Sequence, residues 1–304
     1  MDAHGDRNGL LLGTGAYLIW GLLPLYFKLL VGVPAMQVLA HRIVWSLLFV
    51  AVIVVALRRI AAIREAATPR TLLLLTISAA LIAGNWSIFI WAILNGHVLE
   101  TSLGYFINPL INVAIGVALL GERIRPLQLV AVGIAFVGVL ILTADSLMSG
   151  GTGAWWVPIT LALAFAFYGL VRKVVAIDAL GGLAVETLIL APPALAWLVY
   201  VGGDGSGVFG LDASMDLVLV GAGVLTAIPL LLFAAAARRL RYATLGLLQY
   251  MAPTMGFFEA VLIFGEPLHT VHLVTFALIW IGCALYAVDS LRASREPVME
   301  VPPT

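Results

Sequence analysis

The stretch Asn108–Val130 reads NPLINVAIGVALLGERIRPLQLV, and the stretch Ala252–Val274 reads APTMGFFEAVLIFGEPLHTVHLV. Each combines an early proline with a Gly-Glu pair that ends an apolar run. The shared residues recur at a constant offset of 144: Pro109 with Pro253, Gly121 with Gly265, Glu122 with Glu266, Leu129 with Leu273 and Gly138 with Gly282. We therefore predict two related halves, residues 9–144 and 154–289, with short cytoplasmic tails at 1–8 and 290–304.

The composition around these stretches is that of a membrane protein. The 304 residues are 62% hydrophobic and 11% charged, with a mean hydropathy of +1.10, whereas soluble domains carry about 25% charged residues. The apolar runs are continuous and about 20 residues long, which favours membrane-spanning helices over alternating barrel strands. We predict an all-α polytopic membrane protein with ten transmembrane helices. Their expected ranges are Gly9–Val31, Ala35–Leu57, Thr71–Leu94, Thr101–Leu120, Leu127–Thr143, Ala154–Val171, Leu183–Val201, Leu217–Ala237, Ala243–Phe264 and Val271–Val288.

The basic residues predict how these helices cross the membrane. With the N-terminus in the cytoplasm, 14 of the 16 Lys and Arg residues fall on the cytoplasmic side, and only Lys28 and Arg42 lie inside spans. This bias is the positive-inside pattern of membrane proteins, so both termini are expected in the cytoplasm. Because each half has five spans, the second half must enter the bilayer from the opposite side. Inverted repeats of this kind build many secondary transporters around a binding site at the midplane.

Polar and aromatic residues inside the spans form stripes at helical spacing. Tyr17 and Trp20 share one face of the first span, and Tyr105 and Asn108 share one face of the fourth. We expect the stripes to line a cavity that binds a small molecule through amides and aromatic rings. The alternative is packing between helices, which the same residue types also stabilise. The candidate substrate-binding residues are Tyr17, Trp20, Asn85, Trp86, Tyr105, Asn108, Tyr168, Gln249 and Tyr250.

Five ionisable residues within spans are candidates for gating or for carrying a coupled proton, because such groups are costly in hydrocarbon. They are Lys28, His41, Arg42, Glu186 and Glu259. Each also has a structural alternative. Lys28 can extend to the membrane surface, and Arg42 can anchor backbone carbonyls. A contact with a ligand carboxylate is a further functional possibility for Arg42.

Several functional classes are not supported by the sequence. No Walker A, HExxH or other catalytic motif occurs, so direct ATP drive and enzymatic activity are not expected. The single cysteine, Cys283, excludes an internal disulfide and a cysteine-based metal site. A formal net charge of zero gives no indication of nucleic-acid binding. We expect no cofactor and no metal, and a single copy of the chain suffices for the predicted fold.

A set of motifs resembles one known family along nearly the whole chain. They are Tyr17–Gly21 (YLIWG), Ala40–Arg42 (AHR), Asn85–Trp86, Leu103–Pro109 (LGYFINP), Gly121–Arg123 (GER) and Gln249–Thr254 (QYMAPT). Together they resemble the RarD type of EamA transporters in the drug/metabolite transporter superfamily. The resemblance implies ten helices in two inverted EamA halves, a bacterial inner-membrane location and export of small metabolites. Amino-acid exporters of the YddG type are similar in architecture.

We therefore expect a secondary transporter that exports amino acids, aromatic ones included, by alternating access. Its partners are the lipid bilayer and a small-molecule substrate. An exporter of drugs or organic cations is the main alternative, and anionic residues in the cavity favour it. A passive facilitator or channel is a third possibility.

Overall fold

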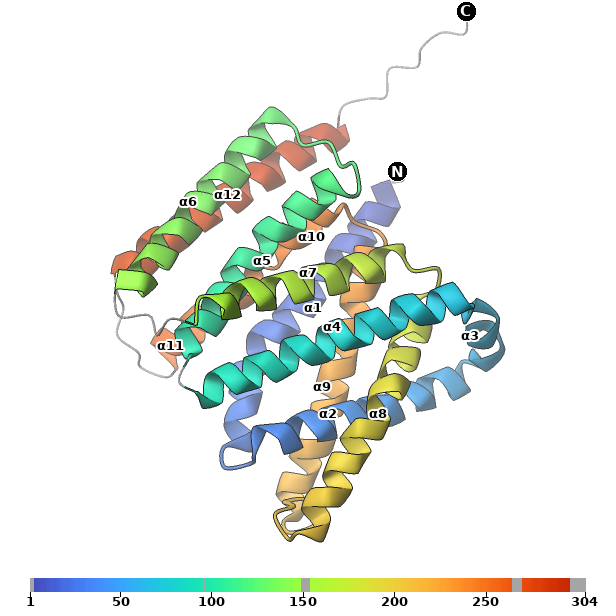
Figure 1. The fold of residues 1–304 in the computed structure, drawn as a ribbon. Coiled ribbons are helices and arrows are strands. Elements are labelled where there is room, and N and C mark those ends of the chain that lie inside the picture. Colours follow the sequence, from blue (N-terminus) through green and yellow to red (C-terminus); the bar gives the residue numbers. More distant parts are fainter. Residues whose placement is uncertain (1–2, 96, 149–153, 264–269, 296–304) are drawn as a thin grey trace, which may run out of the picture.

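The computed structural model describes residues 3–95, 97–148, 154–263 and 270–295, and these ranges contain helices and connecting turns with no strand (Figure 1). The helices are α1 (Ala3–Phe27), η1 (Lys28–Leu30), α2 (Ala35–Ala56), α3 (Ile60–Ala66), α4 (Pro69–Leu94), α5 (Val98–Ala118), α6 (Pro126–Met148), α7 (Trp156–Val174), α8 (Ala179–Gly203), α9 (Ala213–Ala237), α10 (Tyr242–Leu248), α11 (Met251–Leu262) and α12 (Thr270–Arg295).

The predicted multi-pass membrane architecture is confirmed at this level. Within the described residues, eight helices are long and apolar enough to cross a bilayer, namely α1, α2, α4, α6, α7, α8, α9 and α12, and α5 contains a shorter apolar stretch, Leu103–Ala118. Large apolar side chains face outward, with Leu73 62%, Val199 74% and Leu217 73% exposed. A continuous surface of this kind is stable against lipid and not against water. Ten spans and an inverted repeat remain predictions.

The expected ninth span is divided into two helices. α10 ends at Leu248, and α11 begins at Met251. Pro253 has no N–H to donate to the carbonyl of Gln249, which accepts instead from Ala252 N at 3.1 Å. Gln249 N and Tyr250 N also donate three residues back, to Gly246 O and Leu247 O. The tighter turn therefore interrupts the α-helical pattern at Gln249–Tyr250.

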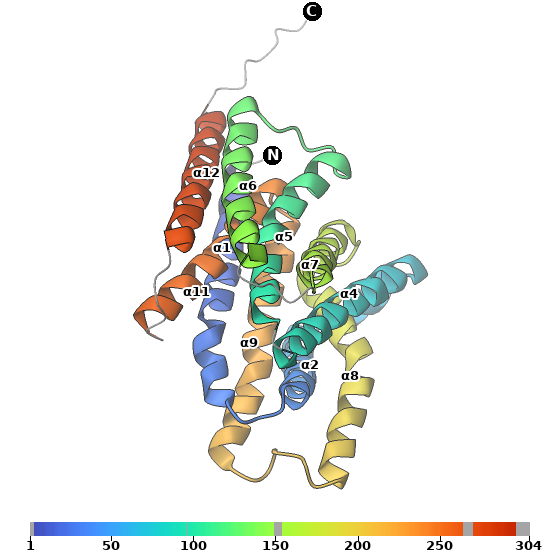
Figure 2. The ribbon, with the colours of Figure 1, turned by 60° about the vertical axis from the view of Figure 1, so that its left-hand side comes forward.

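The helices pack as one bundle in which α9 contacts both α1 and α2 (Figures 1 and 2). α2 packs against α8 and α9, and α4 packs across α7 and α8. α5 packs against α7 and α10, and α1 packs against α9 and α11. α6 and α12 lie side by side along one edge of the molecule. The largest buried apolar cluster includes Phe233 on α9, with Tyr17 on α1 and Tyr168 on α7.

Two glycines allow the close approach of α6 and α12. A Cβ on Gly282 would lie 2.6 Å from Ala131 O, and a Cβ on Gly138 would lie 3.0 Å from Thr275 O. Thr275 Oγ1 also donates to Gly138 O at 3.3 Å. Small residues at a helix–helix contact bring backbones together, which is how helices commonly associate in membranes.

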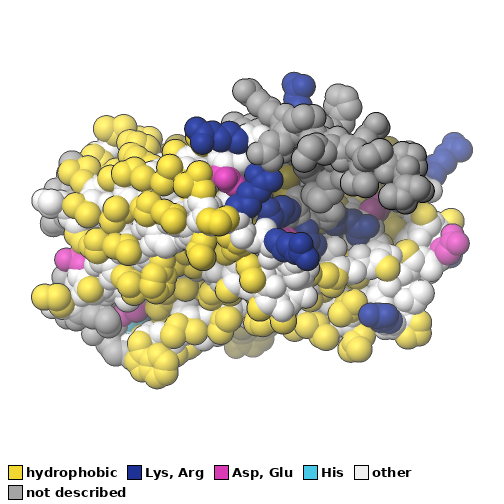
Figure 3. All heavy atoms as spheres, turned by 90° about the horizontal axis from the view of Figure 1, so that it is seen from above, with side chains coloured by type: hydrophobic (Ala, Val, Ile, Leu, Met, Phe, Trp, Pro, Cys, Tyr) yellow, Lys and Arg dark blue, Asp and Glu magenta, His cyan; other side chains and the backbone are white. Residues whose placement is uncertain are grey.

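Basic and acidic side chains close one end of the bundle. Arg238 donates to the carbonyls of Val175 and Ile177, and Lys173 donates to those of Ala237 and Leu240. These bonds satisfy carbonyls at and beyond the C-terminal ends of α7 and α9, where cations are favoured. In Figure 3, Lys and Arg side chains gather on a surface that is otherwise largely hydrophobic.

The Gly-Glu motif lies at the same end. The carboxylate of Glu122 accepts from Tyr242 N and from Ala243 N, the latter at 3.0 Å, and so caps the first turn of α10. Gly121 has a φ of +65°, which favours glycine at that turn. The second copy of the motif, Gly265-Glu266, lies outside the described residues.

Candidate functional site

A small, partly open cavity lies where α2, α4, α7, α8 and α9 meet. Its volume is about 20 Å³, enough for about one water molecule. Six of its lining side chains are polar or aromatic: Ser46, Trp86, Tyr168, Glu186, Thr187 and Thr226. The rest are aliphatic: Ile43, Ile82, Leu183, Leu190 and Leu230. The cavity is therefore a largely apolar chamber with a few hydrogen-bonding residues in its lining.

Glu186 contributes the carboxylate of this chamber. Asp178 caps α8 by accepting from Gly181 N at 2.7 Å, and Glu186 follows two turns into the helix. Its Oε1 accepts from Ser78 Oγ at 2.5 Å and lies 3.5 Å from Arg172 Nη1. Its Oε2 is buried and has no hydrogen-bond partner among the described residues. The side chain therefore keeps one free acceptor.

Arg172 reaches Glu186 from the end of α7. Both side chains are almost completely buried, with relative exposures of 1% and 2%. Nη2 donates to Ala179 O at 2.9 Å. Gly182 makes room for the guanidinium, because a Cβ at that position would overlap it. Removing one member of such a buried pair leaves an uncompensated charge.

Arg42 lies on α2 beside the same chamber. Its Nε donates to Thr226 Oγ1 at 2.8 Å, and its guanidinium carbon lies 4.9 Å from the centroid of the Trp86 ring. Thr226 and Trp86 both line the cavity. The centroid of the Phe27 ring lies 5.3 Å from the same guanidinium carbon. The Tyr105 side chain is close enough to interact electrostatically with the guanidinium. In the described part of the chain, no carboxylate forms an ion pair with Arg42.

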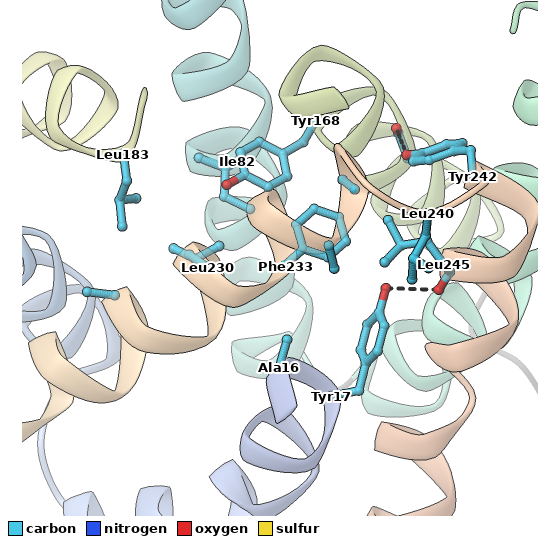
Figure 4. Close-up of a cluster of buried hydrophobic side chains, with 14 of the residues drawn as sticks. Ala16, Tyr17, Ile82, Tyr168, Leu183, Leu230, Phe233, Leu240, Tyr242 and Leu245 are labelled. Atoms are coloured by element: carbon cyan, nitrogen blue, oxygen red, sulfur yellow. Dashed lines mark hydrogen bonds between the residues drawn. The ribbon is translucent and has the colours of Figure 1, made fainter. Parts of the chain in front are cut away.

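An aromatic cluster adjoins the chamber (Figure 4). Tyr168 stacks on Phe233, with ring centroids 6.0 Å apart and planes at 13°. Trp20 contacts Tyr17, Phe165 and Phe233. The hydroxyl of Tyr17 donates to Leu245 O at 3.2 Å, which joins α1 to α10. Of the predicted binding residues in this cluster, only Tyr168 lines the cavity.

The predicted amides bridge helices. Asn85 Nδ2 donates to Leu161 O at 2.9 Å, and Asn108 Nδ2 donates to Ala162 O at 2.6 Å. Asn112 Nδ2 donates to both Asn108 Oδ1 and Gln249 Oε1, each at 3.1 Å. These four side chains are buried. In this conformation their contacts are those of interhelical packing, and a direct role in binding remains a prediction.

Two predicted tyrosines also lie outside the cavity lining. Tyr250 is buried, and its hydroxyl donates to Phe106 O at 3.3 Å, which ties the α10–α11 junction to α5. Tyr105 is half-buried and packs edge-on against Phe89, with ring centroids 5.9 Å apart. Of the nine candidates, Trp86 and Tyr168 therefore line the chamber as it stands.

His41 belongs to a second cavity, on another face of the N-terminal half of α2. This cavity, of about 300 Å³, lies between α2, α8 and the segment that joins α8 to α9. Gln37 holds that segment by donating to Ser206 O at 2.8 Å and accepting from Val208 N at 3.1 Å. His41 Nδ1 accepts from Trp45 Nε1 at 3.3 Å, and the imidazole stacks on Phe209.

The two remaining ionisable candidates lie away from both cavities. Lys28 is exposed in η1. Glu259 on α11 is 5% exposed, and neither carboxylate oxygen has a hydrogen-bond partner in the described ranges. Sequence reasoning missed Arg172, Ser78 and Thr226. Ser78 precedes Asn85 by seven residues and so shares its helix face, which is the one signal that pointed to it.

Comparisons with known proteins agree with this architecture. Residues 7–144 match the EamA-like transporter family. The chain is 44% identical over 300 residues to protein RarD of Escherichia coli K12, covering 97% of this chain and 99% of the relative. It is 47% identical over 292 residues to an uncharacterized transporter of Pseudomonas aeruginosa, covering 95% and 96% of the two chains. It is also 37% identical over 298 residues to a chloramphenicol-sensitive protein RarD of that species, with the same coverage.

A solved crystal structure supports the fold alone. It is 19% identical, covers 94% of this chain and 99% of its own, and superposes with a TM-score of 0.69. The relatives carry the assignment further, because they extend over almost the full length at more than 40% identity, and the family match covers the first part of the chain. The chain therefore belongs to the RarD-type EamA transporters of the drug/metabolite transporter superfamily.

Proposed function

We propose that this transporter exports amino acids, aromatic ones included, across the bacterial inner membrane by alternating access. The observation that carries the proposal is the chamber between α2 and α4 on one side and α7, α8 and α9 on the other. It holds aromatic faces, hydroxyls, a carboxylate and, through Trp86 and Thr226, a neighbouring guanidinium. These groups suit the polar backbone and the apolar side chain of an amino acid.

The pattern of helix contacts supports a repeat. Suppose that α1, α2, α4, α5 and α6 correspond in order to α7, α8, α9, α10–α11 and α12. Exchanging the two halves then turns the contact of α1 with α9 into that of α7 with α4. It likewise turns the contact of α2 with α9 into that of α8 with α4. All four contacts are present, and α2–α8, α5–α10 and α6–α12 map onto themselves. The contacts of Ala131 with Gly282 and of Gly138 with Thr275 are also exchanged by the 144-residue offset. We infer that residues 9–144 and 154–289 form the two halves.

The basic end of the bundle supports the proposed orientation. Arg238, Lys173 and Glu122 belong to segments on the side where the charge bias places the cytoplasm. Both termini of the chain would lie on this side, with the tails 1–8 and 290–304. Reaction of single cysteines near residue 123 and near residue 206 with a membrane-impermeant reagent, in a Cys283→Ser background, tests the assignment.

The transport proposal is tested with purified protein in liposomes that are loaded with labelled amino acids. We expect release above that of protein-free liposomes for at least one aromatic and one aliphatic amino acid. We also expect acceleration when unlabelled substrate is supplied on the opposite side, because a carrier shows countertransport and an open pore does not. An absence of release across a broad panel contradicts amino-acid export, and release without countertransport favours a passive facilitator.

A second candidate, an exporter of organic cations, is favoured by one observation: Glu186 places a carboxylate in the chamber. A carboxylate with aromatic neighbours suits a quaternary ammonium group. Uptake of a quaternary ammonium dye, measured with and without excess amino acid, separates the candidates. Dye uptake that amino acids do not reduce favours the cation exporter.

A further inference from the structure

We propose that Arg42 and Glu186 together form the recognition site for a zwitterion, in which Arg42 binds the carboxylate and Glu186 binds the ammonium group of one ligand. This inference rests on the proposed function and narrows it to substrates that carry both charges. It assigns a role to two charged residues that occupy the same position in the two halves, 144 residues apart.

The ammonium end of the site is already formed. Glu186 Oε2 is buried without a hydrogen-bond partner among the described residues, and Glu186 is one of the residues that line the chamber of about 20 Å³. An ammonium group is similar in size to the single water that such a volume holds. An unpaired buried acceptor is costly unless a donor satisfies it. Oε1 is held by Ser78 and faces Arg172, so the carboxylate is oriented and its second oxygen stays available.

The carboxylate end is formed by Arg42. The guanidinium is held against Trp86 and Thr226, two residues that line the chamber, and no carboxylate of the described residues neutralises it. Its planar fork of donors suits bidentate binding of a carboxylate. Among the described residues, this arginine has a hydroxyl as its hydrogen-bond partner and aromatic rings as its cation–π partners. Its charge is therefore available for a ligand.

The separation of the two residues fits a small zwitterion. Ile43, next to Arg42, packs in one cluster with Leu190 and Ala194 of α8. Glu186 lies one turn before Leu190, so the two charged residues differ by about one to two turns, roughly 5–11 Å, along the packed helices. Both side chains are long, so each can cover part of this separation, and a zwitterion placed between them would cover the rest. The chamber as it stands holds about one water, so it must widen before Ile82, Leu183 and Leu230 can contact the ligand side chain.

The site predicts that each of the two residues affects only the ligands that carry the opposite charge. Three labelled probes that share one phenyl ring test this prediction. These are phenylalanine, phenethylamine, which lacks the carboxylate, and 3-phenylpropionate, which lacks the ammonium group. Equilibrium binding to the purified full-length protein in detergent gives a Kd for each. For the wild type we expect the Kd of phenylalanine to be lower than that of either analogue by about tenfold or more, the usual effect of losing a hydrogen bond to a charged group.

The variants separate recognition from folding. Glu186→Gln is expected to raise the Kd of phenylalanine and of phenethylamine about tenfold and to leave the Kd of 3-phenylpropionate unchanged. Arg42→Gln is expected to raise the Kd of phenylalanine and of 3-phenylpropionate, and not that of phenethylamine. Because Glu186→Gln leaves Arg172 unpaired, Glu186→Gln/Arg172→Gln serves as the variant without either buried charge. Arg59→Gln, which removes an exposed ion pair with Asp178, is the matched control and should match the wild type.

The outcomes are distinct. Losses of affinity that are confined, in each variant, to the probes of opposite charge support the site. Equal losses of affinity for all three probes, or no loss in correctly folded variants, overturn it. If the wild type transports amino acids but does not prefer the zwitterion over both analogues, this inference fails while the proposed function stands. If the wild type neither binds nor transports any amino acid, the proposed function fails with it.

Discussion

The contact of α6 with α12 gives the sharpest stability prediction, for the substitution Gly282→Ala. A Cβ at position 282 would lie 2.6 Å from the backbone oxygen of Ala131 and 3.3 Å from the Ala135 Cβ. Nonbonded heavy atoms prefer about 3.5–4.0 Å, so the helices must separate locally by close to 1 Å. Because the obstacle is backbone and not a flexible side chain, no rotamer change relieves it.

The matched control is Gly133→Ala on α6. A Cβ there meets no atom within 4 Å. Both substitutions gain about 0.5–1 kcal/mol from replacing glycine inside a helix. Gly282→Ala also incurs an overpacking cost of about 1–3 kcal/mol. We therefore expect Gly133→Ala to be neutral or more stable than the wild type, and Gly282→Ala to be about 1–3 kcal/mol less stable than Gly133→Ala.

The assay is reversible unfolding in mixed micelles of increasing denaturing-detergent fraction, followed by tryptophan fluorescence, with the free energy of unfolding compared among the three proteins. Gly138→Ala should fall between the two variants, because its Cβ would lie 3.0 Å from Thr275 O. If Gly282→Ala proves as stable as Gly133→Ala, the close α6–α12 contact is wrong.

Three further predictions concern other contacts. Glu122→Gln should lower the free energy of unfolding by about 1–2 kcal/mol, measured in the same micelles, because a carboxylate that caps α10 with two acceptors is replaced by a group with one. Gly169→Ala should disturb Tyr242 and Phe233, since its Cβ would overlap the Tyr242 hydroxyl and lie 3.0 Å from Phe233 Cζ; an unchanged melting temperature contradicts that packing. Hydrogen bonds from the Ser214 side chain and from backbone N–H groups hold the pKa of Asp212 below its ordinary range. The carboxylate therefore stabilises α9 above about pH 4 and loses this effect as the pH falls, so the melting temperatures of wild type and Asp212→Ala should differ at neutral pH and converge in acid.

Much of the helix layout could be predicted from apolar run length. The second run was expected at Ala35–Leu57, and α2 spans Ala35–Ala56. The ninth run was expected as one helix, and the missing N–H of Pro253 divides it. The short helix α3 was not expected, because seven residues between two spans carry little periodic signal.

The chamber was harder to predict, for a physical reason. Thr187 and Thr226 each donate to the carbonyl four residues earlier, at 2.8 and 2.7 Å, so a lone hydroxyl in an apolar helix has the same local bond whether or not it faces a cavity. Arg172 was counted among the cytoplasmic loop residues, yet its side chain folds back to Glu186. The direction of a long flexible side chain depends on packing partners such as Gly182, which sequence spacing does not reveal.

The interruption at Gln249–Tyr250 also affects how force passes through the molecule. A continuous helix is stiff along its axis, whereas this segment consists of two short helices, α10 and α11, that meet at a junction. The first residues of α10 are hydrogen-bonded to Glu122, and α11 packs against α1. The two helices can therefore change their relative angle at Gln249–Tyr250, where hydrogen bonds to the third residue back replace the α-helical ones.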